Sequence, residues 1–304
     1  MKGMAHLGLD DVNKPIDSEG RTMHVGVNKN EIANIIIAVG DHHRAELVSQ
    51  WLDNPKQIII TKSKRNFHTY TGLFNGVPVS IIATGMGISN TDFLVREARF
   101  VVEGPMAFVR FGTCGILTDK IPPGCIEVPH SSIMIQTNWD FDFDNDPVDE
   151  AFHISKPCKA NPQLSSSLIN AIGRNIGKDK IFSGIDGTAD SFYSSQGRSD
   201  NHFKEKNFKL LDQLIKKYPE MHILEMETHI FYKLAELSLE PKIYASCGCI
   251  TLFNRITNEI LPDKEGKYLE FAGGKSLLEG ITEFQFPEGE PENTKRLIEI
   301  IQKK

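Results

Sequence analysis

Short apolar runs alternate with helix-like segments along most of this chain. The run at residues 35–39 is continuously apolar and ends at Gly40, and further strands are expected at 57–60, 107–111 and 242–252. An apolar run of about four to eight residues is typical of a parallel strand buried on both faces. Strands that alternate with helices predict an α/β protein, a single three-layer αβα domain with a central twisted mixed, mainly parallel sheet.

The domain organisation predicted from this pattern is simple. Residues 1–30 are polar and form an N-terminal arm, and residues 31–304 form one domain without repeat or linker. Asn75-Gly76 predicts a hairpin turn within residues 67–84. Helices are expected at 42–53, 88–103, 163–175, 201–217, 228–239 and about 275–303. The segment 136–160 is long and without an evident pattern, which indicates a flexible loop near a site.

Charge and composition narrow the classes of function. The net charge of −6 gives no basic field for nucleic acid. No apolar run reaches the roughly 18 residues of a membrane span, and no secretory signal is visible, so a cytoplasmic protein is expected. Five scattered cysteines do not make a disulfide framework. Cys247 and Cys249 lack a second pair of ligands, so no metal site is predicted.

Residues after the apolar runs are the candidates for chemistry, because sheets of this type bind ligands at the carboxyl ends of their strands. Gly40 and Arg44 would place backbone N–H groups and a cation near an anion; an ordinary turn with a surface arginine is the alternative. Arg110 ends an apolar strand and precedes Gly112 and Thr113, which favours an oxyanion cradle. A structural carboxylate that pairs with Arg110 explains it equally well.

Two further segments contain groups suited to a nucleoside. Phe192 can stack on a heterocycle, Gln196 offers a donor and an acceptor to a pyrimidine edge, and Arg198 can bind a carbonyl that gains negative charge. A polar loop anchored by aromatic rings is the alternative. Glu227, in Glu225-Met226-Glu227, can hold two neighbouring hydroxyls of a ribose, or it can be an acid stabilised by a helix dipole.

In their order and combination these segments resemble the nucleoside phosphorylase family, and most closely its uridine-specific members. The resemblance covers about residues 24–260. It is carried by the segments 40–44, 65–70, 84–87, 110–115, 192–198, 225–227 and 252–255. The Phe-Tyr-x-x-Gln-x-Arg stretch at 192–198 is its pyrimidine-specific element.

The resemblance implies a role for each matching position. Those that hold phosphate are Gly40, Arg44, Arg110, Thr113 and, from a neighbouring subunit, Arg65. Ribose contacts are Thr84, Met226, Glu227 and the neighbouring subunit's histidine. Base contacts are Gly115, Phe192, Gln196, Arg198, Leu252 and Phe253, and the catalytic residues are Arg110, Gln196 and Arg198.

The histidine has two candidates, because His6-Leu7-Gly8-Leu9 and His24-Val25-Gly26-Val27 both fit the family pattern. His24 lies at about the expected distance from Gly40 and is the choice made here. Asn66 replaces an acid that some bacterial relatives use at an intersubunit potassium site, so no such ion is expected. Cys114 stands where a small hydroxyl residue is common.

The implied reaction is phosphorolysis of uridine, with deoxyuridine or thymidine as further possible substrates. Inorganic phosphate is then a co-substrate and no cofactor is needed. Phosphate is itself the nucleophile, so positioning and electrostatics should supply the catalysis. Purine relatives typically place an Asp in the last strand-end motif to protonate the leaving base, and residues 251–255 contain no acid. A nucleoside hydrolase and a catalytically silent nucleoside-binding protein remain alternatives. A homodimer is the expected minimal active unit, and a hexamer is possible.

Overall fold

One mixed sheet organises the described part of the chain, residues 13–199 and 201–304, in a computed structural model. Its strands are β1 (Ile35–Val39), β2 (Ile59–Lys62), β3 (His68–Phe74), β4 (Val77–Ala83), β5 (Met106–Ile116), β6 (Ile126–Glu127), β7 (Ser131–Thr137), β8 (Phe152–Ile154), β9 (Cys158–Lys159), β10 (Ile181–Phe182), β11 (Ile185–Ala189), β12 (Met221–Glu225) and β13 (Ile243–Asn254). The α-helices are α1 (His42–Ser49), α2 (Ile88–Val101), α3 (Pro162–Asn175), α4 (Leu210–Lys217), α5 (Thr228–Leu237), α6 (Asp263–Glu283) and α7 (Asn293–Gln302). His6 lies outside the described residues.

The strand order is β2-β3-β4-β1-β5-β12-β11-β7-β8, and β13 pairs with β5 outside this path. The pairs β1/β4, β1/β5, β13/β5, β11/β12 and β11/β7 are parallel. β12 runs antiparallel to β5, with Leu224 opposite Gly115. The expected mixed, mainly parallel sheet is therefore confirmed.

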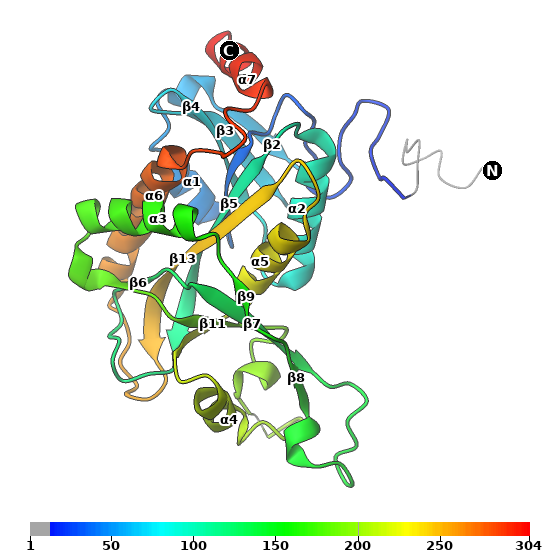
Figure 1. Ribbon diagram of the computed structural model, residues 1–304, viewed down its shortest axis with the longest axis vertical. Helices are drawn as coiled ribbons and strands as arrows, with labels where there is room; N and C mark the ends of the chain where they lie inside the picture. Colours follow the sequence, from blue (N-terminus) through cyan, green and yellow to red (C-terminus); the bar gives the residue numbers. More distant parts are fainter. Residues whose placement is uncertain (1–12, 200) are drawn as a thin grey trace, which may run out of the picture.

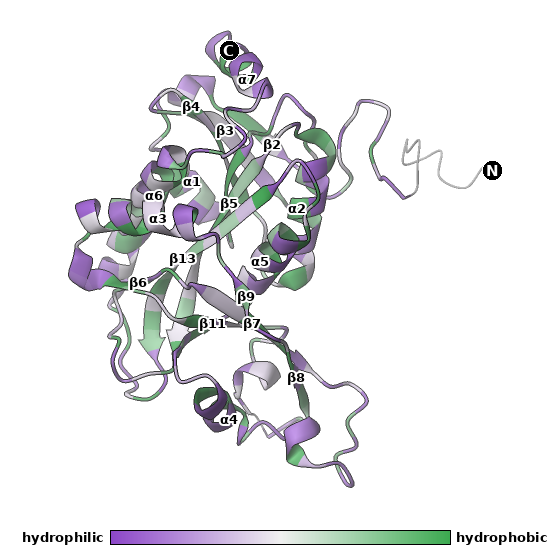
Figure 2. Ribbon diagram, viewed as in Figure 1, coloured by the Kyte–Doolittle hydropathy of each residue, from purple (hydrophilic) through white to green (hydrophobic). Residues whose placement is uncertain are grey.

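Helices cover both faces of the sheet, as the apolar strands require. α1, α3 and α6 lie on one side and α2 and α5 on the other, while α4 and β8 lie in a lobe beyond the lower strand ends (Figure 1). Separate apolar clusters fill the two interfaces: Val48, Leu168 and Leu277 belong to the first, and Leu94 and Phe231 to the second. Hydrophobic residues are concentrated in the central strands (Figure 2). The predicted three-layer arrangement is confirmed.

The hairpin between β3 and β4 has the predicted turn. Asn75 and Gly76 both adopt positive φ, at 49° and 78°. This is the backbone geometry that a two-residue hairpin loop needs, and Asn and Gly adopt it most readily. Asp53 accepts hydrogen bonds from both backbone N–H groups at 2.8 Å, which fixes the turn.

Several predicted boundaries are wrong. β5 was expected to break at Gly112 but continues to Ile116, because β13 pairs with it along its whole length. The helix expected at 275–303 is two helices, α6 and α7, with a proline- and glycine-containing segment between them. α4 begins only at Leu210. The segment 136–160, expected to be a loop, contains the short strands β8 and β9.

The N-terminal segment contributes to the core. Val25 and Val27 are fully buried and pack with α2 residues on one face of the sheet. Glu97 on α2 accepts hydrogen bonds from the backbone N–H groups of His24 and Val25 at 2.7 to 3.0 Å. Residues 24–27 are thus tied to the domain through a buried carboxylate.

Candidate active site

A cavity of about 470 Å³ lies where the ends of β1, β5, β12 and β13 meet. A volume of this size suits a small-molecule ligand. Eleven of the predicted site residues line it: Gly40, Arg44, Arg110, Thr113, Gly115, Phe192, Gln196, Met226, Glu227, Leu252 and Phe253. Its other lining residues are Asp41, Gly85, Met86, Cys114, Leu224 and Glu225. The sheet topology therefore brings together segments that are far apart in the sequence.

Arg44 provides one cation at the wall of the cavity. It lies in the first turn of α1, where Asp41 caps the helix by accepting the Arg44 backbone N–H at 2.8 Å. Its guanidinium pairs with Glu270 on α6 at 2.8 Å and with Asp41 at 3.4 Å. Because the Arg44 side chain is mostly buried, these carboxylates hold the guanidinium at the cavity.

Arg110 provides a second cation, from the middle of β5. Its Nε donates to Glu227 at 3.0 Å, its Nη2 also contacts Glu227, and Glu225 lies 3.6 Å away. Burial by itself lowers the pKa of Arg110, but Glu227 and Glu225 outweigh burial and raise this pKa. Nη1 is buried and has no hydrogen-bond partner among the described residues. Nη1 therefore keeps hydrogen-bond donors that no described residue uses.

The conformation of Arg110 depends on Gly112. A Cβ atom added at Gly112 would lie 2.3 Å from Nη1 of Arg110, which is closer than any real contact. The glycine that the sequence pattern assigned to an oxyanion cradle thus leaves room for the guanidinium. Thr113 follows on the same strand and lines the cavity.

Glu225 and Glu227 flank the start of α5. Glu225 accepts the backbone N–H of Glu227 at 2.9 and 3.0 Å and that of Thr228 at 2.9 Å. Burial, with a smaller contribution from Glu227, raises the pKa of Glu225 to about 7, while Arg110 opposes this. Glu227 also accepts the backbone N–H of Gly87 at 2.5 Å. Both acids are almost fully buried, and Glu227 reaches the cavity beside Arg110.

The predicted base-contacting side chains come from a loop after β11. Gln196 is buried, whereas Phe192 is 45% exposed. Arg198 donates to the side-chain oxygen of Gln196 at 2.7 Å and stacks on the Phe192 ring at 3.9 Å. Burial and the neighbouring Arg255 lower the pKa of Arg198 to about 10. The aromatic ring, the amide and the guanidinium therefore form one contiguous cluster.

Neighbouring segments hold this loop through polar contacts. Arg255 donates to the backbone carbonyl of Gln196 and, at 3.4 Å, to that of Gly197. Asp190 accepts from the Ser195 hydroxyl at 2.6 Å and from the Thr137 backbone N–H at 2.9 Å. The latter contact links the loop to the end of β7, where the 136–160 segment begins.

Gly115, Leu252 and Phe253 form an apolar wall of the cavity. A Cβ atom at Gly115 would lie 2.7 Å from the Phe253 ring, so glycine is needed for the ring to lie there. Asn254 turns away and donates to the backbone carbonyls of Thr118 and Ile121. This wall thus offers no acid to a bound ligand.

Four predicted site residues do not line the cavity. Thr84 is buried next to it, and its hydroxyl lies 3.2 and 2.9 Å from the carbonyls of Val39 and Gly85, to one of which it can donate. Arg198 is half-buried and contacts Gln196 and Phe192 instead. Arg65 is exposed in the turn before β3. His24 stacks on Phe93 at 4.0 Å, and its Nδ1 lies 2.5 Å from Glu97.

Sequence reasoning missed three residues that shape the site. Asp41 follows the first strand and precedes a helix, which is a recognisable N-cap signal. Arg255 ends the motif at 252–255, but its position there does not predict a contact with the base loop. Glu270 had no signal at all, because it lies in the middle of α6, 226 residues from Arg44.

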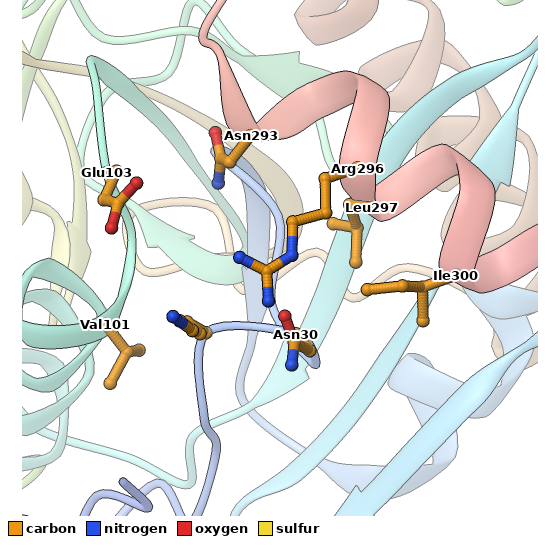
Figure 3. A pocket seen from close by; sticks show the side chains of 8 residues that line it. Asn30, Val101, Glu103, Asn293, Arg296, Leu297 and Ile300 are labelled. Atoms are coloured by element: carbon orange, nitrogen blue, oxygen red, sulfur yellow. The ribbon is translucent and has the colours of Figure 1, made fainter.

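A second hollow, between α7 and residues 29–30, is too small for a nucleoside. Figure 3 shows Arg296 extending from α7 toward Asn30, with Glu103 and Asn293 nearby. Its volume of about 10 Å³ holds about one water molecule.

In the described residues no group of three or more His, Cys, Asp or Glu side chains is placed to hold a metal ion. No helix there is long and apolar enough to cross a membrane.

Comparison with known proteins agrees with this geometry. The family model described as "Phosphorylase superfamily" matches residues 34–251, which is well over half of the chain. The chain therefore belongs to the phosphorylase superfamily.

Within this superfamily the chain is similar to uridine phosphorylases. It is 26% identical to uridine phosphorylase of Thermococcus kodakarensis over 81% of this chain and 82% of the relative. It is also 26% identical to the Haemophilus influenzae enzyme, over 78% and 88% of the two chains. A solved structure from a study of two uridine phosphorylases of the oomycete Phytophthora capsici shares 35% identity. It superposes with a TM-score of 0.85, covering 90% of this chain and 98% of that one.

Proposed function

We propose that this protein is a uridine phosphorylase, a pentosyltransferase that converts uridine and inorganic phosphate into uracil and ribose 1-phosphate. The observation that carries the proposal is the composition of the main cavity. It joins two buried arginines, a buried carboxylate and an aromatic–amide cluster in one space of about 470 Å³. These groups match the phosphate, the sugar and the base of the reaction in turn. The similarity to uridine phosphorylases supports the same conclusion.

Phosphate would bind between Arg44 and Arg110, with the Thr113 hydroxyl and the backbone at Gly40 as further donors. Both guanidiniums are held by carboxylates before the ligand arrives. Pre-positioned donors act strongly in a site from which water is excluded, and their reorganisation costs little during the reaction. Phosphate supplies the nucleophilic oxygen, so these residues orient and stabilise rather than react.

Glu227 would exchange partners during binding. In the free protein it pairs with Arg110. When phosphate binds the Arg110 guanidinium, the Glu227 carboxylate becomes available to accept hydrogen bonds from two ribose hydroxyls. Met226 and Thr84 flank this position. Phosphate and nucleoside should therefore bind more tightly together than either does alone.

Uracil would lie between Phe192 and the apolar wall of Leu252 and Phe253. As the bond between C1′ and the base breaks, its electron pair goes to the base while a phosphate oxygen bonds to C1′. Gln196 can hydrogen-bond the pyrimidine edge. Arg198, which donates to the Gln196 side-chain oxygen, would act through Gln196 on the negative charge that develops on the uracil carbonyls. A leaving purine would need an acid near this wall that gives it a proton, and the wall has none.

A second copy of the chain would complete each site. Arg65 and His24 do not line their own chain's cavity, and Arg65 is exposed. We therefore propose a homodimer as the minimal active unit, in which each copy contributes these residues to the other's site. Three such dimers could form a hexamer. We further propose that the protein is cytoplasmic and needs no cofactor.

Base release from uridine, with and without phosphate, tests the proposed reaction. Uracil is expected only when phosphate is present, and inosine should yield no hypoxanthine. Thymidine and deoxyuridine in parallel give the substrate range. Uracil release without phosphate would instead indicate a hydrolase, and bound but uncleaved uridine would indicate a binding protein.

Mixing two inactive variants tests the shared site. In a dimer of R65A with R110A, one site receives both defects and the other receives neither. Random mixing should therefore restore about a quarter of the wild-type activity, because half of the dimers are mixed and each has one intact site. No recovery after the subunits have exchanged would contradict the shared-site arrangement.

A further inference from the structure

A buried chain of polar groups continues from the cavity into the protein. Glu225 contacts the Thr188 hydroxyl at 2.7 Å, and the same hydroxyl contacts Asp186 at 2.8 Å. Ser132 lies at the far end, 2.5 Å from Asp186. Asp186, Thr188 and Ser132 are fully buried, and Glu225 is almost so. None of the three residues beyond Glu225 lines the cavity.

The hydrogens available at Thr188 do not suffice for two ionised carboxylates. Its hydroxyl oxygen already accepts the backbone N–H of His229 at 2.8 Å. A hydroxyl has a single hydrogen to donate. Thr188 can donate to Glu225 or to Asp186, but the other contact then has no hydrogen unless that carboxyl carries a proton itself. One of the two acids must therefore be neutral.

The surroundings place the proton on Asp186. Glu225 accepts two backbone N–H groups and lies 3.6 Å from the Arg110 guanidinium, all of which favour its ionised form. Asp186 has no cation and no backbone donor at hydrogen-bond distance, and its Oδ1 has no partner in the described part of the chain. A buried carboxylate whose neighbours are hydroxyls alone is costly, whereas a neutral carboxylic acid in the same place costs less.

We propose that Asp186 is a neutral carboxylic acid that keeps its proton and donates it in a hydrogen bond to the Thr188 hydroxyl. Thr188 in turn donates to the ionised Glu225, which fixes Glu225 and so positions Arg110 and Glu227. Asp186 is a positioning residue, because it touches neither substrate. This inference rests on the proposed function only where it predicts kinetics.

This series of hydrogen bonds ends at Glu225, where the phosphate and ribose positions meet. Glu225 holds the start of α5 through the N–H groups of Glu227 and Thr228. If Asp186 lost its proton, two buried negative charges would face each other across Thr188. Arg110 would also be surrounded by more negative charge, and phosphate would bind less tightly. Burial and the charge of Glu225 raise the pKa of Asp186 well above its ordinary range, which agrees with a neutral acid.

Both stability and phosphate binding should depend on pH through Asp186. Since the folded state holds the proton more tightly than the unfolded chain, stability should fall as pH rises toward the raised pKa, and phosphate binding should fall as pH passes through it. The other titratable groups around Asp186 are Glu225 on β12, His229 and Tyr232 on α5, Cys114 on β5 and Cys249 on β13. Cysteine and tyrosine can also titrate in alkaline solution, so a control must separate them.

Infrared spectroscopy of the full-length protein tests the charge directly. Wild-type protein at pH 8 should show a protonated-carboxyl band that disappears in Asp186→Asn. The absence of such a band, or its persistence in Asp186→Asn, would overturn the proposal. This measurement needs no turnover. A wild-type protein that failed to cleave uridine would contradict the proposed function, while the band would still decide the state of Asp186.

Kinetics test the positioning role. Asp186→Asn keeps a neutral donor, so kcat/KM for phosphate at pH 7 should stay within about threefold of wild type, and its fall at alkaline pH should vanish. Thr188→Val interrupts the hydrogen bonds between Asp186 and Glu225. It should lower kcat/KM for phosphate about tenfold or more, the loss expected when a buried hydrogen-bonded group is left unpaired. Thr188→Ser should restore it, and Cys249→Ser should keep the alkaline fall. Asp186→Asn as damaging as Thr188→Val at pH 7 would overturn the proposal.

Discussion

The two ends of the cavity are built differently. At the phosphate and ribose end, Arg110 and Glu225 lie on strands in the centre of the sheet and are almost fully buried. At the base end, Phe192 and Gln196 lie on a loop, and Phe192 is half exposed. The first end is fixed by main-chain hydrogen bonds and ion pairs within the core. The second is held by a few contacts from Arg255, Asp190 and their neighbours.

This difference matches the demands of the chemistry. The groups that bind phosphate and ribose act where charge changes most, and rigid elements hold such groups best. A flat base that must enter and leave is better served by a loop that can open. Substitutions at the first end should therefore act mainly on catalysis, and those at the second mainly on nucleoside binding.

Arg110→Lys should have the largest effect. Lysine keeps the charge but cannot pair with Glu227 through two N–H groups and still offer a free edge to phosphate. We expect kcat/KM for phosphate to fall by at least about 10²-fold, the usual loss for one pre-positioned donor. Steady-state kinetics with varied phosphate measure this. The matched control is Arg96→Lys, whose exposed ion pair with Asp92 should leave activity unchanged. Equal effects of the two would break the comparison.

Gln196→Leu should have an intermediate effect that is confined to the base end. It leaves the polar edge of uracil without a partner and removes one acceptor of Arg198, so kcat/KM for uridine should fall about 10- to 100-fold. Phosphate affinity, measured by calorimetry without nucleoside, should not change. A parallel loss of phosphate affinity would show that the two ends are not independent.

Arg255→Met should have the smallest effect. It keeps the apolar stem but removes the donors to the carbonyls of Gln196 and Gly197. The loop should then open more often, so KM for uridine should rise about fivefold while kcat stays near the wild-type value. A loss of kcat without a change in KM would mean that Arg255 acts on the chemical step instead.

The same contrast explains what the sequence predicted. Strand ends and hairpin turns leave local signals, such as Gly40 after an apolar run or Asn75-Gly76 between two strands. These signals located the fold and Arg44 and Arg110. The partners of these arginines were less accessible: Glu270 comes from a distant helix, and the passage of β5 through Gly112 depends on pairing with β13. Contacts between segments far apart in sequence leave no local pattern.

Boundaries failed for a related reason. Residues 275–303 were expected to be one helix, but Pro287, Gly289 and Pro291 separate α6 from α7. Proline restricts the backbone of the residue before it and favours a helix end there. Residues 201–209 are polar enough for an exposed helix, yet Asn207 instead donates to the carbonyls of Ser194 and Arg198 and joins this segment to the base loop.

The most direct test of the central claim is the identity of the sugar product. Uridine and phosphate are incubated with the protein, and the phosphorus signals are followed by nuclear magnetic resonance while uracil is measured by absorbance. We expect ribose 1-phosphate in a one-to-one ratio with uracil, with an equal loss of inorganic phosphate. Uracil accompanied by free ribose and unchanged phosphate would contradict it.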